Sequence, residues 1–189
     1  MLMRRNLLDA TVHLLGVLGS ERLTTTAIVE QAHVSSGTFY RYFSDKAEIL
    51  DVLRDEAVTA INADLLAGFA RALALDLEPA VREVLETLTD ALERHRAVIG
   101  AMVNSVPAGS QANLLPEIEE GLVQLGRVIP TRHLPGASRE RIDALVFLTM
   151  GVALASCLRI ALHRPAGSSR GELIDIAATM VTAALRAEP

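Results

Sequence analysis

Residues 35–46 carry the side chains of this sequence that are best suited to contact a nucleic acid. The run Ser-Ser-Gly-Thr-Phe-Tyr-Arg-Tyr-Phe-Ser-Asp-Lys places hydroxyl groups, two phenols, an arginine and the chain's only lysine within twelve positions. Hydroxyl, phenol and cationic groups bind phosphate oxygens and base edges in protein–DNA complexes. Ser35 also stands where a serine caps the first turn of a helix. The segment therefore predicts a short helix whose exposed face can bind DNA.

The residues just before this segment predict the element that positions it. Residues 23–34 form a short amphipathic stretch in which Thr24 can cap the first turn, while Ile28 and Ala32 share one face. His33 lies where the chain must turn before the second helix begins. Two short helices joined by a tight turn form a helix-turn-helix, with the motif at about residues 24–43. Val34, Phe39 and Phe43 are expected to form its small core.

The first 55 residues resemble the N-terminal domain of tetracycline-repressor-type (TetR) transcriptional regulators. The resemblance rests on the register Thr24, Ile28, Ala32, Val34, Ser35, Gly37, Thr38, Tyr40, Tyr42, Phe43 and Lys46. In that family the second helix of the motif enters the major groove of operator DNA. The chain departs from the family pattern at His33, where glycine is usual because the backbone tends toward positive φ, and at Val29, where alanine is common. Histidine tolerates positive φ better than most residues.

The resemblance also implies a role for individual residues. Tyr42 and Lys46 are expected to hold phosphate oxygens, and the hydroxyls of residues 24–26 are expected to reach the DNA backbone. Residues 36–38 and Tyr40 are expected to lie at or near base edges. The predicted DNA-binding residues are Thr24, Thr25, Thr26, Ser35, Ser36, Gly37, Thr38, Tyr40, Arg41, Tyr42 and Lys46.

Lys46 has an independent physical argument. We expect Ser44 to cap the next helix and Asp45 to suit its positive end, whereas a lysine in the first turn is opposed by the helix dipole. A group outside the fold, such as a phosphate, is therefore expected to bind Lys46. The alternative is an ordinary solvated surface charge.

The charge balance argues weakly against DNA binding. The chain has a net charge of −5, and residues 1–54 contain six basic and six acidic side chains. The basic footprint of many DNA-binding domains is therefore absent. Arg4, Arg5, Arg41 and Lys46 can still share one side. We accordingly predict a modest affinity that depends on few phosphate contacts per subunit.

Composition predicts an all-α protein. Half of the 189 residues are hydrophobic, aromatic residues are few, and no run alternates as a strand does. We expect about nine helices in two domains: a three-helix DNA-binding domain at 1–50, and a helical ligand-binding and dimerisation domain at 51–189. Expected helices include 4–18, 45–73, 138–163 and 170–187, with breaks at 107–110, 130–137 and 164–169. The single cysteine, Cys157, and the absence of a signal-peptide pattern favour a cytoplasmic protein.

Residues 97–116 contain no charged side chain, yet Gly100, Pro107 and Gly109 interrupt them too often for a membrane span. They predict either a buried helical centre or the lining of an apolar cavity with polar handles. The resembled family has an inducer pocket in this region, so a small, largely apolar effector is expected. The candidate ligand-binding residues are His95, Met102, Asn104, Ser105, Gln111, Met150 and Arg159, although ordinary core packing remains the alternative for each.

A second uncharged run, residues 144–158, and the last helix are rich in small residues. Two such helices per chain predict a four-helix interface in a homodimer, and the resemblance implies the same. The predicted interface residues are Gly151, Ala155, Ile174, Ala177, Ala178, Val181, Ala184 and Leu185. A dimer would read a palindromic operator with two recognition helices.

The sequence predicts no catalytic residue, metal site or cofactor, because the five histidines are scattered and no nucleophile motif or phosphate loop is present. The resulting hypothesis is a ligand-responsive repressor whose partners are double-stranded operator DNA, a small-molecule effector and a second copy of the chain, with no membrane. Two alternatives stay open: a helical dimer that binds DNA without sequence preference or acts as an adaptor, and an enzyme on a helical scaffold that converts a small molecule.

Overall fold

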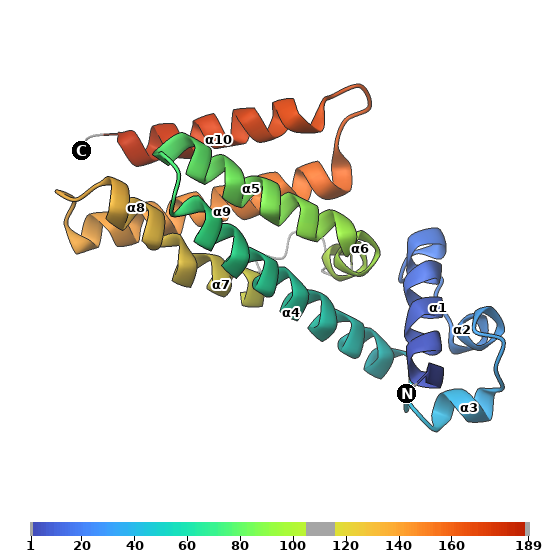
Figure 1. Ribbon diagram of the computed structural model, residues 1–189. Helices are drawn as coiled ribbons and strands as arrows, with labels where there is room; N and C mark the ends of the chain where they lie inside the picture. The colour runs from blue at the N-terminus through green and yellow to red at the C-terminus, as the bar shows by residue number, and fades with distance from the viewer. Residues whose placement is uncertain (1, 105–115, 188–189) are drawn as a thin grey trace. The chain divides into compact units, whose positions relative to one another are not determined.

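The computed structural model describes residues 2–104 and 116–187, and their regular structure is entirely α-helical (Figure 1). This confirms the predicted all-α class. Ten helices lie within the described ranges, against about nine expected. They are α1 (Leu2–Leu18), α2 (Thr25–Gln31), α3 (Ser36–Tyr40), α4 (Lys46–Ala72), α5 (Leu77–Arg94), α6 (Arg96–Asn104), α7 (Pro116–Gly126), α8 (Val128–His133), α9 (Arg139–His163) and α10 (Arg170–Arg186).

The chain divides into two compact units. Unit 1 comprises Met1–Thr59 and His95–Leu114, and unit 2 comprises Ala60–Arg94 and Leu115–Pro189. The boundary predicted at residue 50 lies inside α4, a single long helix that contributes to both units. The segment that includes α6 belongs to unit 1, where α6 packs on α1, a pairing that the sequence did not predict.

Unit 1 is built on the apolar face of α1. Leu7, Leu8 and Leu15 are buried in this unit, together with Phe39 and Phe43 of the motif. Gly19 ends α1 in the left-handed conformation (φ 74°), and its N–H donates to the Leu15 carbonyl over 3.1 Å. This is the usual way for a glycine to close a helix.

Unit 2 has α5 packed against both α9 and α10, while α7 and α8 pack on α9. The interior is apolar, and Cys157 of α9 lies in it with its thiol directed to the Leu85 carbonyl of α5 (3.6 Å). Burial raises the pKa of this thiol to about 12. Cys157 is thus a small buried side chain and not an exposed thiolate.

Ion pairs join α5 to the start of α10 within unit 2. Arg170 pairs with Asp90 and Glu93, and Arg164 in the loop before α10 also reaches Glu93. The predicted break at 164–169 is correct, since Ser169 caps α10 by accepting from the Glu172 N–H. These contacts fix where α10 begins.

Three details of the prediction need correction. Pro130 lies inside the short helix α8, where the predicted break at 130–137 placed a loop, so the loop is restricted to residues 134–138. The helix tolerates Pro130 because a proline in the first turn has no intrahelical N–H to lose. The capping side chain of α4 is Asp45, not Ser44, because the Asp45 carboxylate accepts from the Glu48 N–H over 2.9 Å. The third break, at 107–110, lies outside the described residues.

Helix α9 is unusually apolar. Among the described residues it is the one helix long and apolar enough to cross a membrane, with a mean hydropathy of 2.1 over the best window. Half of that window is buried among the other helices of unit 2. A core helix of a helical bundle passes the same test of length and composition, and α9 packs as such a helix.

Candidate nucleic-acid interface

The two helices of the motif begin at the predicted caps. The Thr24 hydroxyl accepts from the Ala27 N–H over 3.1 Å at the start of α2. The Ser35 hydroxyl accepts from the Thr38 N–H over 3.2 Å at the start of α3, and it also bonds the Thr38 hydroxyl over 3.0 Å. These bonds satisfy amides that a helix start leaves without partners. Ser35 and Thr38 therefore hold α3 in place whether or not they also touch DNA.

The turn between α2 and α3 has the predicted backbone conformation. His33 has a φ of 54°, and among the described residues it is the only non-glycine residue with positive φ. Its N–H donates to the Glu30 carbonyl, and the Asn6 side chain of α1 donates to the Ala32 carbonyl over 2.8 Å. Asn6 thus ties α1 to the turn. Sequence reasoning missed Asn6, because nothing in the local pattern signals a bond across 26 positions.

The outward surface of α3 is polar over an aromatic base. Phe39 and Phe43 are buried, whereas Tyr40 is 59% exposed and stands edge-on to the Phe39 ring. Arg41 is exposed, with its guanidinium 5.1 Å from the centre of the Tyr42 ring. Ser36 and Gly37 lie beside the cap, and both are exposed. A firmly anchored helix therefore presents hydroxyl, phenol and guanidinium groups to solvent, as a DNA-reading helix must.

The hydroxyls at the start of α2 lie on the same unit. Thr24 is exposed and Thr25 is half-buried, while Thr26 is exposed. Thr24 already serves as a cap, so its oxygen is shared between the helix and any phosphate. The other two hydroxyls lie in the first turn, where a phosphate would also meet the positive end of the helix.

Lys46 lies in the first turn of α4, as predicted, but it has a partner inside the fold. Its Nζ donates to the Leu23 carbonyl over 3.1 Å. This bond offsets the unfavourable position of Lys46 at the helix start, so the helix dipole alone no longer requires a group outside the fold. An ammonium has three donors, so two remain for solvent or phosphate.

The Glu48 carboxylate completes the start of α4 by accepting from the Ser44 N–H over 2.5 Å. Hydrogen bonds from Ser44 lower the pKa of Glu48, and Arg4 contributes to the same effect. With Asp45 capping the helix in return, the two acids form a reciprocal capping arrangement. The junction between α3 and α4 is thus held by hydrogen bonds on both sides.

Arg5 is engaged in ion pairs within the fold. It forms ion pairs with Asp9 and with Glu56 of α4, both at 2.8 Å. Arg4 lies with its guanidinium 5.4 Å from the centre of the Phe43 ring. Arg5 is thus paired with two carboxylates, and its expected grouping with Arg4, Arg41 and Lys46 on one side stays a prediction.

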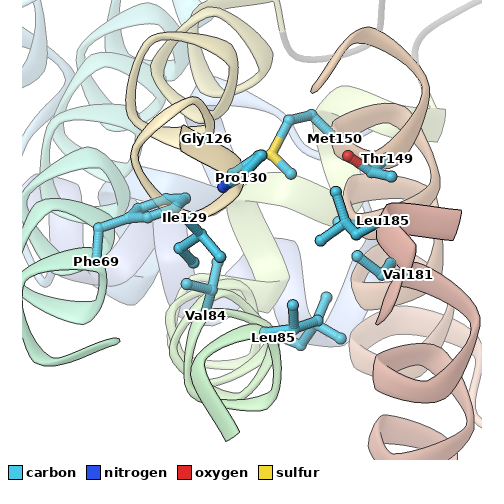
Figure 2. A pocket seen from close by; sticks show the side chains of 12 residues that line it. Phe69, Val84, Leu85, Gly126, Ile129, Pro130, Thr149, Met150, Val181 and Leu185 are labelled. Carbon is cyan, nitrogen blue, oxygen red and sulfur yellow. The ribbon is translucent and has the colours of Figure 1, made fainter. Parts of the chain in front are cut away.

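Unit 2 contains a small apolar cavity of about 20 Å³ (Figure 2). Phe69 of α4, Ile129 and Pro130 of α8, and Met150 of α9 line it, together with residues of α5 and α10. The one hydroxyl in the lining belongs to Thr149, which donates to the Leu145 carbonyl over 2.6 Å. No charged side chain lines this cavity, so only an uncharged, apolar group fits it.

The other candidate ligand-binding residues do not converge on this cavity. Met150 lines it, whereas Arg159 lies in an open groove between α9 and α10. Asn104 lines a groove between α1 and α6 in unit 1, the unit to which His95 and Met102 also belong. Ser105 and Gln111 lie outside the described residues.

The predicted dimer residues divide between the core and the surface. Ala155 and Ala184 are exposed and Gly151 is half-buried, so these three remain available. The following five are buried within unit 2 and cannot face a second subunit: Ile174, Ala177, Ala178, Val181 and Leu185. The apolar side chains of α9 and α10 that do reach solvent are Phe147, Leu148, Val152, Ile176 and Met180. The prediction chose the wrong face of α10.

Comparisons with known proteins agree with the fold and with the motif. A family described as "Bacterial regulatory proteins, tetR family" matches residues 7–53. No curated protein matches the chain.

Solved structures of TetR-family regulators are similar to the chain over almost its whole length. The fatty acid degradation regulator FadR of Bacillus halodurans has a TM-score of 0.69 at 14% identity, covering 98% of this chain and 97% of that one. FadR of Thermus thermophilus, a repressor solved with lauroyl-CoA, has a TM-score of 0.62 at 21% identity, covering 98% and 96%. The regulator PfmR of Thermus thermophilus has a TM-score of 0.62 at 18% identity, covering 95% and 97%.

Identities this low show the shared fold alone, whereas the family match identifies the motif itself. The match covers the segment that contains the helix-turn-helix. The helix-turn-helix segment thus belongs to the bacterial regulatory proteins of the tetR family, and the chain as a whole has the fold of TetR-family transcriptional regulators.

Proposed function

We propose that this protein is a cytoplasmic, ligand-responsive transcriptional repressor that binds a palindromic operator as a homodimer. A small, largely apolar effector releases it from DNA. The observation that carries the proposal is the outward face of α3, where Gly37, Tyr40 and Arg41 are exposed above a buried aromatic base. Groups fixed on a rigid helix can read a base sequence, because their positions do not change between the free and the bound protein.

The proposed contacts divide by role. Ser36, Gly37 and Tyr40 lie at or near base edges and give sequence preference, while Tyr42 and Lys46 hold phosphates and set the position of the motif. The capping hydroxyls of Ser35 and Thr38 orient the start of α3. The three threonines at 24–26 reach the DNA backbone at the start of α2.

A homodimer is proposed because α9 and α10 expose apolar side chains that one unit leaves uncovered. Leu148 is 65% exposed and Met180 is 56% exposed. Such a surface is typical of a protein–protein interface. Two recognition helices related by a twofold axis would then read two half-sites about one DNA turn apart.

The effector is proposed to enter the cavity beside Phe69 and Met150. Its apolar lining favours a hydrocarbon portion, and the similar Thermus thermophilus repressor was solved with lauroyl-CoA. A cavity of about 20 Å³ has room for about one water-sized group. An acyl chain must therefore open it by moving the side chains that line it.

That requirement supplies the mechanism. An effector that binds only the opened form stabilises it relative to the closed form, which shifts the population. Phe69 lies near the end of α4, and Lys46 is the first residue of the same helix. A change around Phe69 is proposed to act through α4 on the position of the DNA-binding residues.

The first test is binding of the purified protein to DNA flanking its own gene and to random DNA at near-physiological salt. We expect selective binding by the wild type and weaker binding by Tyr42→Phe and Lys46→Ala. Removing the Lys46 phosphate contact from each subunit should lower the slope of log K against log salt by about 1.8 for a dimer. Arg132→Ala, an exposed charge on α8, is the matched control and should change neither.

Equal binding to both DNAs would point to a dimer that binds without sequence preference. Selection from random sequences would then reveal any operator that lies elsewhere in the genome. If selection yields no preferred sequence, the repressor proposal is wrong.

A further inference from the structure

Three arginines gather at one end of unit 2, where α9 begins and α10 ends (Figure 1). Arg139 and Arg141 lie in the first turn of α9, and Arg186 is the last residue of α10. The two helix ends are in contact, because the Arg141 Nη2 donates to the Ala187 carbonyl over 2.6 Å. We call these three arginines the basic end of unit 2. They stand out in a chain whose net charge is −5.

The two acidic side chains in the first turns of α9 are already engaged. Hydrogen bonds from its own backbone N–H and from the Ser138 hydroxyl lower the pKa of Glu140, so the Glu140 carboxylate helps to close the start of α9. The Asp143 carboxylate pairs with Arg127 at 3.1 Å. Neither acid is therefore left to neutralise the basic end.

Two arginines of the basic end have no acidic partner. Arg139 and Arg186 are exposed, and no carboxylate lies within 4 Å of either among the residues that the structure describes. Glu188, the next acid along the chain, lies outside those residues. Arg186 suits the negative end of α10, whereas Arg139 is opposed by the positive end of α9. Cations that gather without counter-charges attract anions from solution.

The apolar cavity of unit 2 lies near the basic end. Leu185 lines the cavity and directly precedes Arg186. Pro130 of the lining belongs to α8, the helix that leads into α9. Thr149 of the lining follows Arg139 by ten residues of helix, which span about 15 Å. A molecule with an apolar chain in the cavity and an anionic group at its other end can therefore contact both.

We propose that the effector carries a phosphate-bearing head group, which Arg139, Arg141 and Arg186 bind while the acyl chain opens the cavity. A guanidinium binds phosphate oxygens through paired hydrogen bonds, which fix the position of the head group. Arg141 keeps donors for this purpose, because a guanidinium has five N–H groups. A head group with several phosphates matches several guanidinium groups, whereas a free fatty acid offers a single carboxylate. This inference rests on the acyl effector of the proposed function and adds the chemistry of its other end.

The test measures the binding of three probes to the purified protein, without DNA, by isothermal titration calorimetry. Lauroyl-CoA has both the acyl chain and the phosphates, free dodecanoate has the chain alone, and free coenzyme A has the phosphates alone. We expect lauroyl-CoA to bind at least about tenfold more tightly than either of the others. The dissociation constant of lauroyl-CoA should also rise more steeply with salt than that of dodecanoate, because salt screens the contacts between phosphates and exposed arginines.

The matching variant combines Arg139→Ala and Arg186→Ala, which leaves the bond from Arg141 to the Ala187 carbonyl in place. We expect it to bind lauroyl-CoA about tenfold more weakly than the wild type and to bind dodecanoate equally well. Without ligand it should unfold at the wild-type temperature, because both side chains are exposed.

Two further variants show whether the arginines act by direct contact. Arg139→Lys combined with Arg186→Lys keeps the charge without the paired donors, so it should restore part of the lost affinity for lauroyl-CoA. Arg22→Ala removes an exposed arginine of unit 1 and is the control for the change in net charge. It should bind all three probes as the wild type does.

The outcomes separate this inference from the proposed function. If neither lauroyl-CoA nor dodecanoate binds, the acyl effector is refuted and the head-group site falls with it. If lauroyl-CoA binds no more tightly than dodecanoate, or if the double alanine variant loses no more affinity than Arg22→Ala, the head-group site is refuted and the acyl effector stands. If free coenzyme A binds as tightly as lauroyl-CoA, the chain contributes nothing, and the joint use of the cavity and the basic end is refuted.

Discussion

A methyl group added at Gly126 tests whether an effector uses the cavity of unit 2. Gly126 ends α7, and a Cβ there would lie 2.7 Å from Met150 Sδ and 3.1 Å from Met150 Cγ. Ordinary contact needs about 3.5–4.0 Å, so the thioether must move by about 1 Å. Methionine side chains adapt easily, and the nearest free space is the cavity that both residues line. We therefore expect Met150 in Gly126→Ala to fill that space.

The expected effects on stability and on binding differ. Replacing a helical glycine by alanine stabilises by up to about 1 kcal/mol, and repacking around the new methyl costs about 1–3 kcal/mol. The unfolding free energy should therefore change little or fall by up to about 3 kcal/mol. Each ligand methylene excluded from the cavity loses about 0.8 kcal/mol, which is about a fourfold loss of affinity. Gly126→Ala should thus weaken an acyl effector at least about fourfold.

The assay titrates the protein–operator complex with lauroyl-CoA, and separately with free dodecanoate, while operator release is followed by fluorescence anisotropy. Gly171→Ala is the control, because a Cβ there meets only Ser169 Oγ at 3.8 Å and lies away from the cavity. Equal effector concentrations for release of the wild type and Gly126→Ala would refute the cavity as the effector site. Release of neither protein by either compound would refute acyl chains as the effector class.

Three further predictions concern the fold. Burial raises the pKa of Cys157 in the folded protein to about 12, so the thiol loses its proton at lower pH in the unfolded chain than in the folded one. The unfolding free energy should therefore be unchanged below about pH 8. It should fall by about 1.4 kcal/mol per pH unit from about pH 9 toward pH 12. Urea unfolding under reducing conditions should show this slope in the wild type and not in Cys157→Ala. Gly68→Ala should lower the melting temperature, because the new Cβ would lie 2.7–2.9 Å from side-chain atoms of Thr87. Overpacking there costs about 1–3 kcal/mol of unfolding free energy, which the gain in helix propensity of about 1 kcal/mol does not offset. Asn6→Ala removes the bond to the Ala32 carbonyl and should cost about 1 kcal/mol in chemical unfolding while weakening operator binding more than binding to random DNA.

The helix-turn-helix could be predicted because its determinants are local. Thr24 and Ser35 cap helices through bonds that span three residues, and the conformation of His33 follows from the tight turn. The bond from Lys46 to Leu23 spans 23 positions, and no pattern in the sequence signals it. The prediction was thus correct that Lys46 lies in the first turn of α4, but it missed the hydrogen bond from Lys46 to the Leu23 carbonyl.

The inward face of α10 could not be chosen from the sequence, because the helix has apolar residues on two sides. Ile174, Ala178 and Val181 form one stripe at helical spacing, and Ile176 and Met180 lie on another. The spacing of the apolar residues alone does not show which stripe faces the core and which faces a second subunit. Packing on α5 and α9 decides, and it buries the first stripe. The small residues of α10 thus allow close packing within the subunit. The prediction had assigned them to the contact between subunits.

The charge distribution of unit 1 limits how operator recognition can work. Arg5 is held by two carboxylates, Arg54 pairs with Asp51 and Asp55, and Lys46 shares its ammonium with a carbonyl. Counterion release by so few free cations gives a shallow dependence on salt. In the proposed operator complex, much of the affinity would then come from neutral donors on α3 and at the helix starts, which bond only when they fit the groove. Such donors contribute little binding free energy at a DNA site where they are misaligned. A domain with this charge balance is therefore expected to bind random DNA weakly and its operator selectively.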